Sequence, residues 1–221
     1  DVVLSQSGVI LDYLAEKLEL YCFAQSGNSY KAALMLNIAG ADWQPQFVDF
    51  FNGEHRAPEY LAMNEMGEVP VLRHGDVVLS QSGVILDYLA EKLGKFGPQD
   101  DDERREVLRW MLFDNHKFTS NIATYRFMAF LARVGDPAVH EFLKGRMIQA
   151  LKVVERRLRD REFLLGDRLT IADFSLLGYL YYPDEFGMEG WPDFPNIRRW
   201  TGTVAAMDGF VPPYELMPKA K

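Results

Sequence analysis

Two short polar stretches carry side chains that could stabilise a bound anion. Gln25-Ser26-Gly27-Asn28-Ser29 follows the apolar run 20–23, and Ser80-Gln81-Ser82-Gly83 follows the apolar run 77–79. Hydroxyl and amide donors favour the charged form of a bound acid, and a helix N-terminus adds backbone N–H groups and a favourable dipole. Each stretch also has a purely structural alternative, because Ser, Gly and Asn form turns and Ser commonly caps a helix.

The other reactive side chains form no metal or redox motif. The four histidines stand far apart, without the spacing of zinc ligands, so we expect no metal site. The single cysteine, Cys22, excludes an internal disulfide and a Cys-x-x-Cys pair, which suits a reducing cytoplasm. Because Cys22 lies in an apolar strand-like run, we expect it to be buried and inert.

The composition is that of an ordinary globular protein. Hydrophobic residues make up 48% of the sequence and charged residues 25%. A net charge of -8 argues against a nucleic-acid partner, which normally meets a basic face. No apolar run approaches the roughly 20 residues of a membrane-spanning helix, so we expect no membrane partner.

Residues 19–95 alternate between strand and helix patterns. We expect strands at 20–23 and 46–50, a helix at 30–39, and a short helix at 58–63. A hairpin follows, in which 69–72 pairs with 77–79 around the turn His74-Gly75. An amphipathic helix then begins near Ser82. This order predicts an α/β domain with a mixed sheet.

Residues 103–221 show helical patterns only. Residues 94–102 contain Gly97-Pro98 and consecutive aspartates, which predicts a linker. Helices are expected at 103–132, at 139–158, after the capping box Thr170–Asp173, and at 195–207. The sequence therefore predicts an all-α C-terminal domain.

An eighteen-residue segment occurs twice, letter for letter, at 1–18 and at 76–93. Repeat proteins carry several diverged units at a fixed period, which this pair does not resemble. The second copy continues the predicted hairpin, whereas the first copy runs directly into Glu19 without a linker. We therefore interpret residues 1–18 as a non-native appendage.

Three motifs, in this order along the chain, resemble those of cytosolic glutathione transferases. Glu68-Val69-Pro70-Val71-Leu72 resembles the strand that opens with a cis-proline in thioredoxin-like domains. Gln81-Ser82 resembles the family's acidic-or-Gln plus Ser pair, and Gly166–Asp173 resembles its buried-helix capping signature. The resemblance covers Glu19 to Lys221 and is nearest to bacterial, theta- and nu-like classes that use Ser or Asn. It implies a thioredoxin-like domain followed by an all-helical domain, a cytoplasmic location and a twofold homodimer.

The resemblance also implies a binding site for glutathione, the expected co-substrate. The γ-glutamyl carboxylate would meet Ser82 and the N-terminus of its helix, with Gln81 beside it. The backbone of Val69, before a cis bond to Pro70, would pair with the glutathione cysteine like an added strand.

The same resemblance implies roles for the first polar stretch. Ser26 matches the catalytic Ser of theta-like classes, and Asn28 matches the Asn of some bacterial classes with an offset of one residue. A neutral donor directed at sulfur would lower the thiol pKa. Tyr21 lies outside the catalytic positions, and we interpret it as a packing residue. Cys22 departs from classes with a catalytic Cys, which argues against chemistry by a protein thiol.

The second substrate would lie between the domains, beside the first long helix. That region is rich in aromatic residues, at Trp110, Phe113, His116, Phe118, Tyr125 and Phe127, of which two or three would line a pocket for a small apolar electrophile. The first candidates are Trp110, Phe113 and His116, although such stripes are more often core. For Arg126 there are two alternatives, a solvated surface position, which we expect, and a position facing a second anionic group. The implied reaction is attack of the glutathione thiolate on an electrophile, a peroxide or a disulfide. The alternative is a related binding or regulatory protein without turnover.

Overall fold

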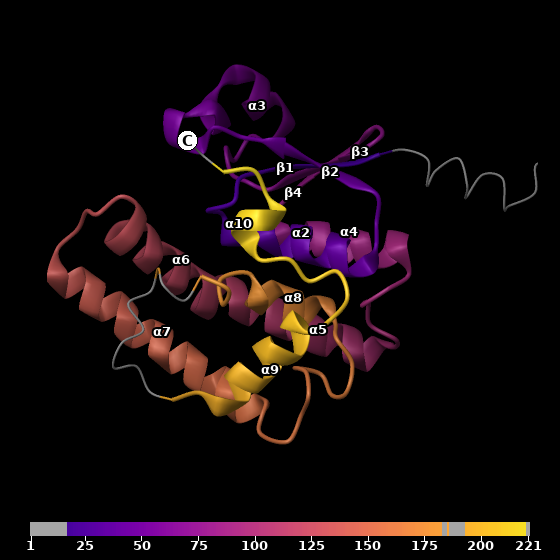
Figure 1. The fold of residues 1–221 in the computed structure, drawn as a ribbon, viewed down its shortest axis with the longest axis vertical. Coiled ribbons are helices and arrows are strands. Elements are labelled where there is room, and N and C mark those ends of the chain that lie inside the picture. Colours follow the sequence, from indigo (N-terminus) through magenta and orange to yellow (C-terminus); the bar gives the residue numbers. More distant parts are fainter. Residues whose placement is uncertain (1–16, 183–184, 186–192, 220–221) are drawn as a thin grey trace, which may run out of the picture.

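The computed structural model describes residues 17–182, 185 and 193–219 (Figure 1). An N-terminal α/β domain packs on a C-terminal helical domain. In the α/β domain, α3 (Pro58–Met63) lies on one face of the sheet. Helices α2 (Gly27–Ala39) and α4 (Ser82–Leu93) lie on the other face, between the strands and the helical domain (Figure 1). Most of the first copy of the repeated segment lies outside the described residues. Its last residue, Leu18, already belongs to the sheet.

The four-stranded sheet has the order β2-β1-β3-β4. Its strands are β1 (Leu18–Cys22), β2 (Trp43–Phe47), β3 (Val71–His74) and β4 (Val77–Ser80). β1 is parallel to β2 and antiparallel to β3, and β3 and β4 form the expected hairpin. The turn of this hairpin contains Gly75 at a φ of +57°, a conformation that glycine adopts at low cost.

The strand register brings three separate segments to one end of the sheet. Tyr21 pairs with Val71, and Val71 pairs with Ser80. The chain that leaves β1, the chain that enters β3 and the chain that leaves β4 therefore meet there. These are the segments that carry the predicted anion-binding side chains.

Helix α2 (Gly27–Ala39) begins three residues earlier than expected. Ser26 is its N-cap, and the Ser26 hydroxyl accepts a hydrogen bond from the backbone N–H of Ser29 at 3.1 Å. Three of the five residues in the stretch 25–29, predicted as a loop, therefore form the first helical turn. The expectation of a strand at 46–50 is also wrong by three residues, because the chain turns into η1 (Phe50–Asn52) and η2 (Glu54–Arg56). The short helix α3 (Pro58–Met63) is confirmed.

Helix α4 (Ser82–Leu93) has no side-chain cap at its N-terminus. The N-cap position is occupied by Gln81, at a φ of +67°, rather than by a serine. The expectation that a serine caps this helix is therefore wrong. The backbone N–H groups of its first turn are not satisfied by a capping side chain and can serve an anion.

The first long helix of the C-terminal domain is interrupted by two π-helical segments. It starts at Asp101, capped by Asp100, so the predicted linker ends two residues early. Its parts are α5 (Asp101–Phe113), η3 (Asp114–Thr119), α6 (Ser120–Arg126) and η4 (Phe127–Leu131). The other helices are α7 (Pro137–Arg157), α8 (Ile171–Leu177), α9 (Pro195–Ala205) and α10 (Pro213–Leu216).

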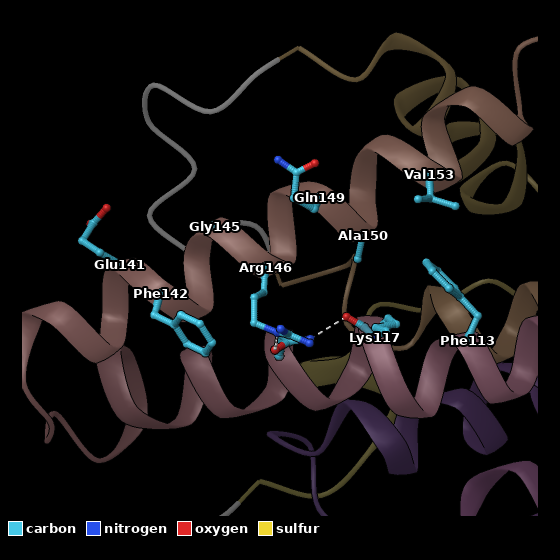
Figure 2. A pocket seen from close by; sticks show the side chains of 10 residues that line it. Phe113, Lys117, Glu141, Phe142, Gly145, Arg146, Gln149, Ala150 and Val153 are labelled. Atoms are coloured by element: carbon cyan, nitrogen blue, oxygen red, sulfur yellow. Dashed lines mark hydrogen bonds between the residues drawn. The ribbon is translucent and has the colours of Figure 1, made fainter.

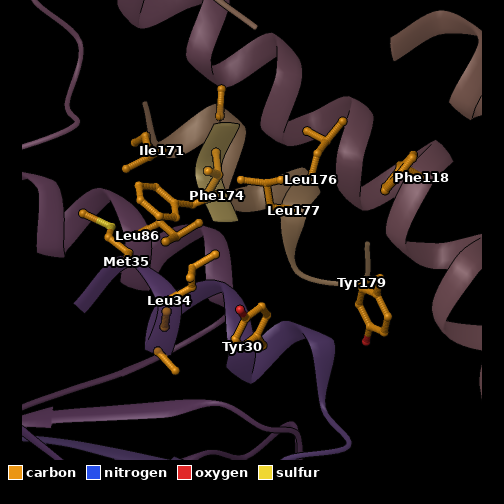
Figure 3. Packing of buried hydrophobic residues seen from close by; sticks show 14 of the residues in the cluster. Tyr30, Leu34, Met35, Leu86, Phe118, Ile171, Phe174, Leu176, Leu177 and Tyr179 are labelled. Atoms are coloured by element: carbon orange, nitrogen blue, oxygen red, sulfur yellow. The ribbon is translucent and has the colours of Figure 1, made fainter. Parts of the chain in front are cut away.

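The predicted capping box begins the buried helix α8. The backbone N–H of Thr170 donates to Oδ2 of Asp173 at 2.9 Å, and Nε1 of Trp200 donates to Oδ1 of Asp173 at 3.1 Å. Every residue of α8 is buried. Figure 3 shows its side chains packed toward α2 and α4, so one apolar core joins the two domains.

Candidate functional site

A cleft of about 440 Å³ lies between the two domains, beside the end of the sheet where the three segments meet. It brings together Ser26, Asn28 and Val69 from the α/β domain. The helical domain contributes α6 and η4. Its lining residues are Phe23, Gln25, Ser26, Asn28, Phe50, Phe51, Glu68, Val69, Ala123, Thr124, Arg126, Phe127, Leu131 and Tyr179.

Ser26 combines a structural and a potential chemical role. Its side-chain oxygen accepts from the Ser29 N–H, so the hydroxyl hydrogen remains available for an acceptor. The residue is 8% exposed, in a setting where water competes little for that hydrogen. The Ser26 side chain can therefore cap α2 and donate a hydrogen bond to an anion at the same time. Asn28, in the first turn of α2, also lines the cleft, and its Oδ1 is buried without a hydrogen-bond partner.

The Val69–Pro70 peptide bond is cis, as the resemblance implies. Val69 lines the cleft together with Glu68. Nε2 of Gln81 donates to Oε2 of Glu68 at 3.0 Å, which ties the start of α4 to the rim of the cleft. Ser82, which is buried, follows as the first residue of α4. Pro70, Gln81 and Ser82 thus adjoin the cleft without lining it.

The three residues predicted for the second-substrate pocket do not line this cleft. Trp110 is buried, with its ring 5.4 Å from that of Phe113. Phe113 faces a different hollow, of about 680 Å³, between the first long helix and α7 (Figure 2). His116 is exposed on η3. The wall of the cleft is formed further along the helix, by Ala123, Thr124, Phe127 and Leu131.

The expectation of a solvated Arg126 is also wrong. Arg126 is 1% exposed and forms an ion pair with Glu185. Its Nη1 donates to the carbonyl oxygen of Gln25 at 2.5 Å. No sequence pattern links these positions, because Glu185 lies 59 residues and Gln25 lies 101 residues away along the chain.

The packing predictions for Cys22 and Tyr21 are confirmed. Cys22 is fully buried, and burial raises the pKa of its thiol to about 12. Its thiol is therefore protonated at neutral pH and is not a nucleophile. Tyr21 packs with the small cluster of Val48, Tyr60 and Val71, and the guanidinium of Arg73 lies 5.8 Å from its ring centre.

His55 lies next to the cleft wall without pointing to metal chemistry. Its ring stacks on that of Phe50, with the centres 4.0 Å apart, and burial lowers its pKa. Over residues 17–182, 185 and 193–219, no cluster of three or more His, Cys, Asp or Glu side chains is placed to bind a metal ion. In the same ranges no helix has the length and apolar character needed to cross a membrane.

The chain matches two family models, in the order of its two domains. Residues 16–91 match the glutathione S-transferase N-terminal domain, and residues 119–208 match the C-terminal domain. Glutathione S-transferase 3 of Zea mays is 32% identical over 206 residues, which cover 87% of this chain and 91% of the maize protein.

Two crystal structures give the same result for the fold. A glutathione S-transferase from Pseudomonas fluorescens superposes with a TM-score of 0.81 at 32% identity, over 89% of this chain and 98% of that one. A glutathione transferase from Burkholderia graminis, with two glutathione molecules bound per subunit, has a TM-score of 0.78 at 25% identity, over 95% and 94% of the two chains. With its thioredoxin-like domain, its helical domain and the interdomain cleft, this chain belongs to the glutathione transferase family.

Proposed function

We propose that Ser26 stabilises the thiolate of glutathione in the interdomain cleft, with Asn28 as a second donor. The observation that supports this most directly is the Ser26 hydroxyl, whose acceptor side is occupied by the Ser29 N–H and whose hydrogen is free. A donor held in this way favours the charged form of a thiol and so lowers its pKa. Cys22 cannot replace the glutathione sulfur, because burial raises its pKa to about 12.

Glutathione would lie along the end of the sheet, with its cysteine paired to the backbone of Val69. Its γ-glutamyl carboxylate would reach Ser82 and the uncapped N-terminus of α4. Gln81, which is bonded to Glu68, would stand beside the γ-glutamyl group. This arrangement would leave the sulfur close to Ser26, at the side of the cleft that faces the helical domain.

The second substrate would occupy the part of the cleft formed by the helical domain. Ala123, Phe127 and Leu131 offer apolar surface there, and Phe50 and Phe51 offer more from the opposite side. A small apolar electrophile fits such a lining. Holding thiolate and electrophile together would supply proximity, and Ser26 would supply the stabilisation of the sulfur anion. A peroxide or a mixed disulfide is an equally suitable acceptor of the same thiolate.

A homodimer is part of the proposal, since isologous pairs are the commonest oligomers. Val84 on α4 and Leu108 on α5 line one surface hollow, and both are more than half exposed, at 52% and 56%. Leu112, one turn after Leu108, is 59% exposed. Apolar side chains gathered on one face in this way are typical of an interface. We also propose a cytoplasmic location, where glutathione is kept in the thiol form and a lone free thiol such as Cys22 persists.

A calorimetric titration of glutathione into the chain tests the binding site. Saturable binding is expected, and Ser82→Ala should weaken it about tenfold, since a charged group would lose one hydrogen bond. Ser120→Ala is the matched control, because the exposed Ser120 hydroxyl bonds only to the carbonyl oxygen of His116. Equal affinity in the two variants would reject the carboxylate site at Ser82. Glutathione binding without turnover on aryl halides, peroxides or disulfides would instead favour a binding or regulatory protein.

A further inference from the structure

The loop that leads into Ser26 is held by side chains of the helical domain, including Arg126 of the cleft lining. The hydroxyl of Tyr182 donates to the carbonyl oxygen of Ala24 at 2.6 Å, and Nη1 of Arg126 donates to that of Gln25 at 2.5 Å. The backbone N–H of Ala24 donates to the carbonyl oxygen of Pro218 at 2.7 Å. The three consecutive peptide groups before Ser26 are therefore each held by a segment that is distant in sequence.

The orientation of Arg126 is itself fixed by a polar network in which Arg126 is buried and its partners Glu185 and Tyr214 are partly buried. Its Nε donates to Oε2 of Glu185 at 2.7 Å, and its Nη2 donates to the same carboxylate and to the Tyr214 hydroxyl oxygen, the latter at 3.3 Å. The guanidinium carbon lies 4.0 Å from the centre of the Tyr182 ring. A planar guanidinium bound on two sides has a fixed direction for each remaining N–H. Nη1 is therefore directed at the Gln25 carbonyl.

Arg126 is the last residue of α6, whose residues Ala123 and Thr124 line the cleft. The helix that forms the second-substrate wall is thus also the helix that holds the loop of the thiolate donor. A displacement of α6 would therefore move the wall beside the second substrate and the loop before Ser26 at the same time.

We propose that Arg126 is a positioning residue for thiolate formation. Its guanidinium fixes the Gln25 carbonyl and, through the next peptide, the place of the Ser26 hydroxyl relative to the glutathione sulfur. Tyr182 acts in the same way through the Ala24 carbonyl. Neither side chain needs to touch the sulfur. The inference rests on the proposed role of Ser26 and adds to it the contacts that hold Ser26 in place.

Arg126→Lys is the main test, because lysine keeps a cation beside Glu185 but cannot reproduce the fork that reaches Gln25. The pKa of the bound glutathione thiol is measured from the ultraviolet absorbance of its thiolate as a function of pH. It should rise by about one unit, since the hydrogen bond to sulfur weakens when the donor moves. With 1-chloro-2,4-dinitrobenzene as electrophile, kcat near pH 6.5 should fall about tenfold and recover at higher pH, with the KM for glutathione within about twofold.

Tyr182→Phe removes one hydroxyl and keeps the ring under the guanidinium, so it carries the test if Arg126→Lys does not fold. The pKa of the glutathione thiol bound to this variant should also rise. Arg198→Lys, which alters an exposed arginine paired with Asp193, should leave the thiol pKa unchanged.

Ser26→Ala in the same series distinguishes the donor role of Ser26 from the positioning role of Arg126 and Tyr182. If Ser26→Ala raises the thiol pKa while Arg126→Lys and Tyr182→Phe do not, the positioning role is refuted and the role of Ser26 stands. If Ser26→Ala leaves the thiol pKa unchanged, the proposed role of Ser26 fails first. A rise in the KM for glutathione alone, at constant kcat and thiol pKa, would also refute positioning.

Discussion

Lys31 and Asp114 form an ion pair that is buried between the two domains, with Nζ and Oδ2 2.7 Å apart. Lys31 lies on α2, one turn after the residues that line the cleft, and Asp114 begins the π-helical segment η3. The hydroxyls of Thr119 and Ser175 each donate to the Asp114 carboxylate, both at 2.6 Å. The pair therefore joins α2, the first long helix of the C-terminal domain and α8 at one point.

Asp114→Ala should destabilise the fold by about 3–5 kcal/mol, because it leaves the Lys31 ammonium buried without a counter-charge. Urea unfolding measures the change. The double variant Lys31→Met, Asp114→Leu should be markedly less destabilised than Asp114→Ala, since no unpaired charge remains. Asp102→Ala, which breaks the exposed pair with Arg105, is the control and should cost less than about 1 kcal/mol. Similar losses for Asp102→Ala and Asp114→Ala would contradict this account of the buried pair.

The architecture could be predicted from the sequence where local signals agree with the tertiary structure. The β3–β4 hairpin follows from two apolar runs around Gly75, and α8 follows from the capping box of Thr170 and Asp173. Each feature rests on residues that are near neighbours in sequence. The first residue of α2 was harder to predict, because Ser26 is compatible with either a loop or an N-cap.

Apart from Phe127, the helical wall of the cleft could not be predicted, for a geometric reason. A π-helical segment inserts a residue and so rotates the following side chains by about 100° around the helix axis. η3 and η4 lie on either side of α6, so the apolar stripe of α5 does not continue on the same face. The contacts of Arg126 could not be predicted either, since Gln25 and Glu185 approach it only in the folded chain.

Ser26→Ala should reduce kcat by about 10²- to 10³-fold, the usual loss when one donor to a developing anion is removed. Asn28→Ala should have a smaller effect, because Asn28 is the second donor of the proposal. The measurement is kcat with an aryl halide at several pH values, together with the affinity for glutathione, which should change little. A larger loss for Asn28→Ala than for Ser26→Ala would reverse the two roles.

Cys22→Ala should leave turnover unchanged, since the Cys22 thiol is fully buried in the β1 strand and its pKa is raised to about 12. A thiol-labelling reagent should react slowly with the native protein at pH 8 and rapidly after unfolding in urea. The rate of labelling, followed by mass, provides the check. Rapid labelling of the native chain, or loss of turnover in Cys22→Ala, would show that the sulfur takes part in chemistry.

The stability of the chain should depend on the titration of Asp173. Burial raises the pKa of this carboxyl to about 6, above the 3.8 of an unperturbed Asp, although four hydrogen bonds from Leu164, Thr170 and Trp200 oppose the shift. Between these two values the folded state binds a proton that the unfolded state does not. The contribution of Asp173 to stability is therefore fully present below about pH 4 and is lost as the pH rises through about 6.

Comparison with Asp173→Asn isolates this contribution. The asparagine variant should be less stable at every pH, because its amide NH₂ would face donors rather than acceptors. The gap in unfolding free energy between wild type and Asp173→Asn should widen by about 1 kcal/mol as the pH falls from 7 to 5. Urea unfolding at both values measures the gap, and a gap that narrows over this range would show that the folded-state pKa is not raised.

The exposed apolar face of α4 and α5 should form the contact of a twofold dimer. Leu108→Glu places a charge in the hollow shared with Val84, where a partner subunit would have to desolvate it. The variant should be monomeric at micromolar concentration by sedimentation, while wild type is dimeric. Its fold should be little affected, because Leu108 is 56% exposed in the single chain. Val134→Glu, at an equally exposed position between η4 and α7, should remain dimeric. A monomeric wild type would refute the dimer. A dimer that persists in Leu108→Glu would show that the interface lies elsewhere.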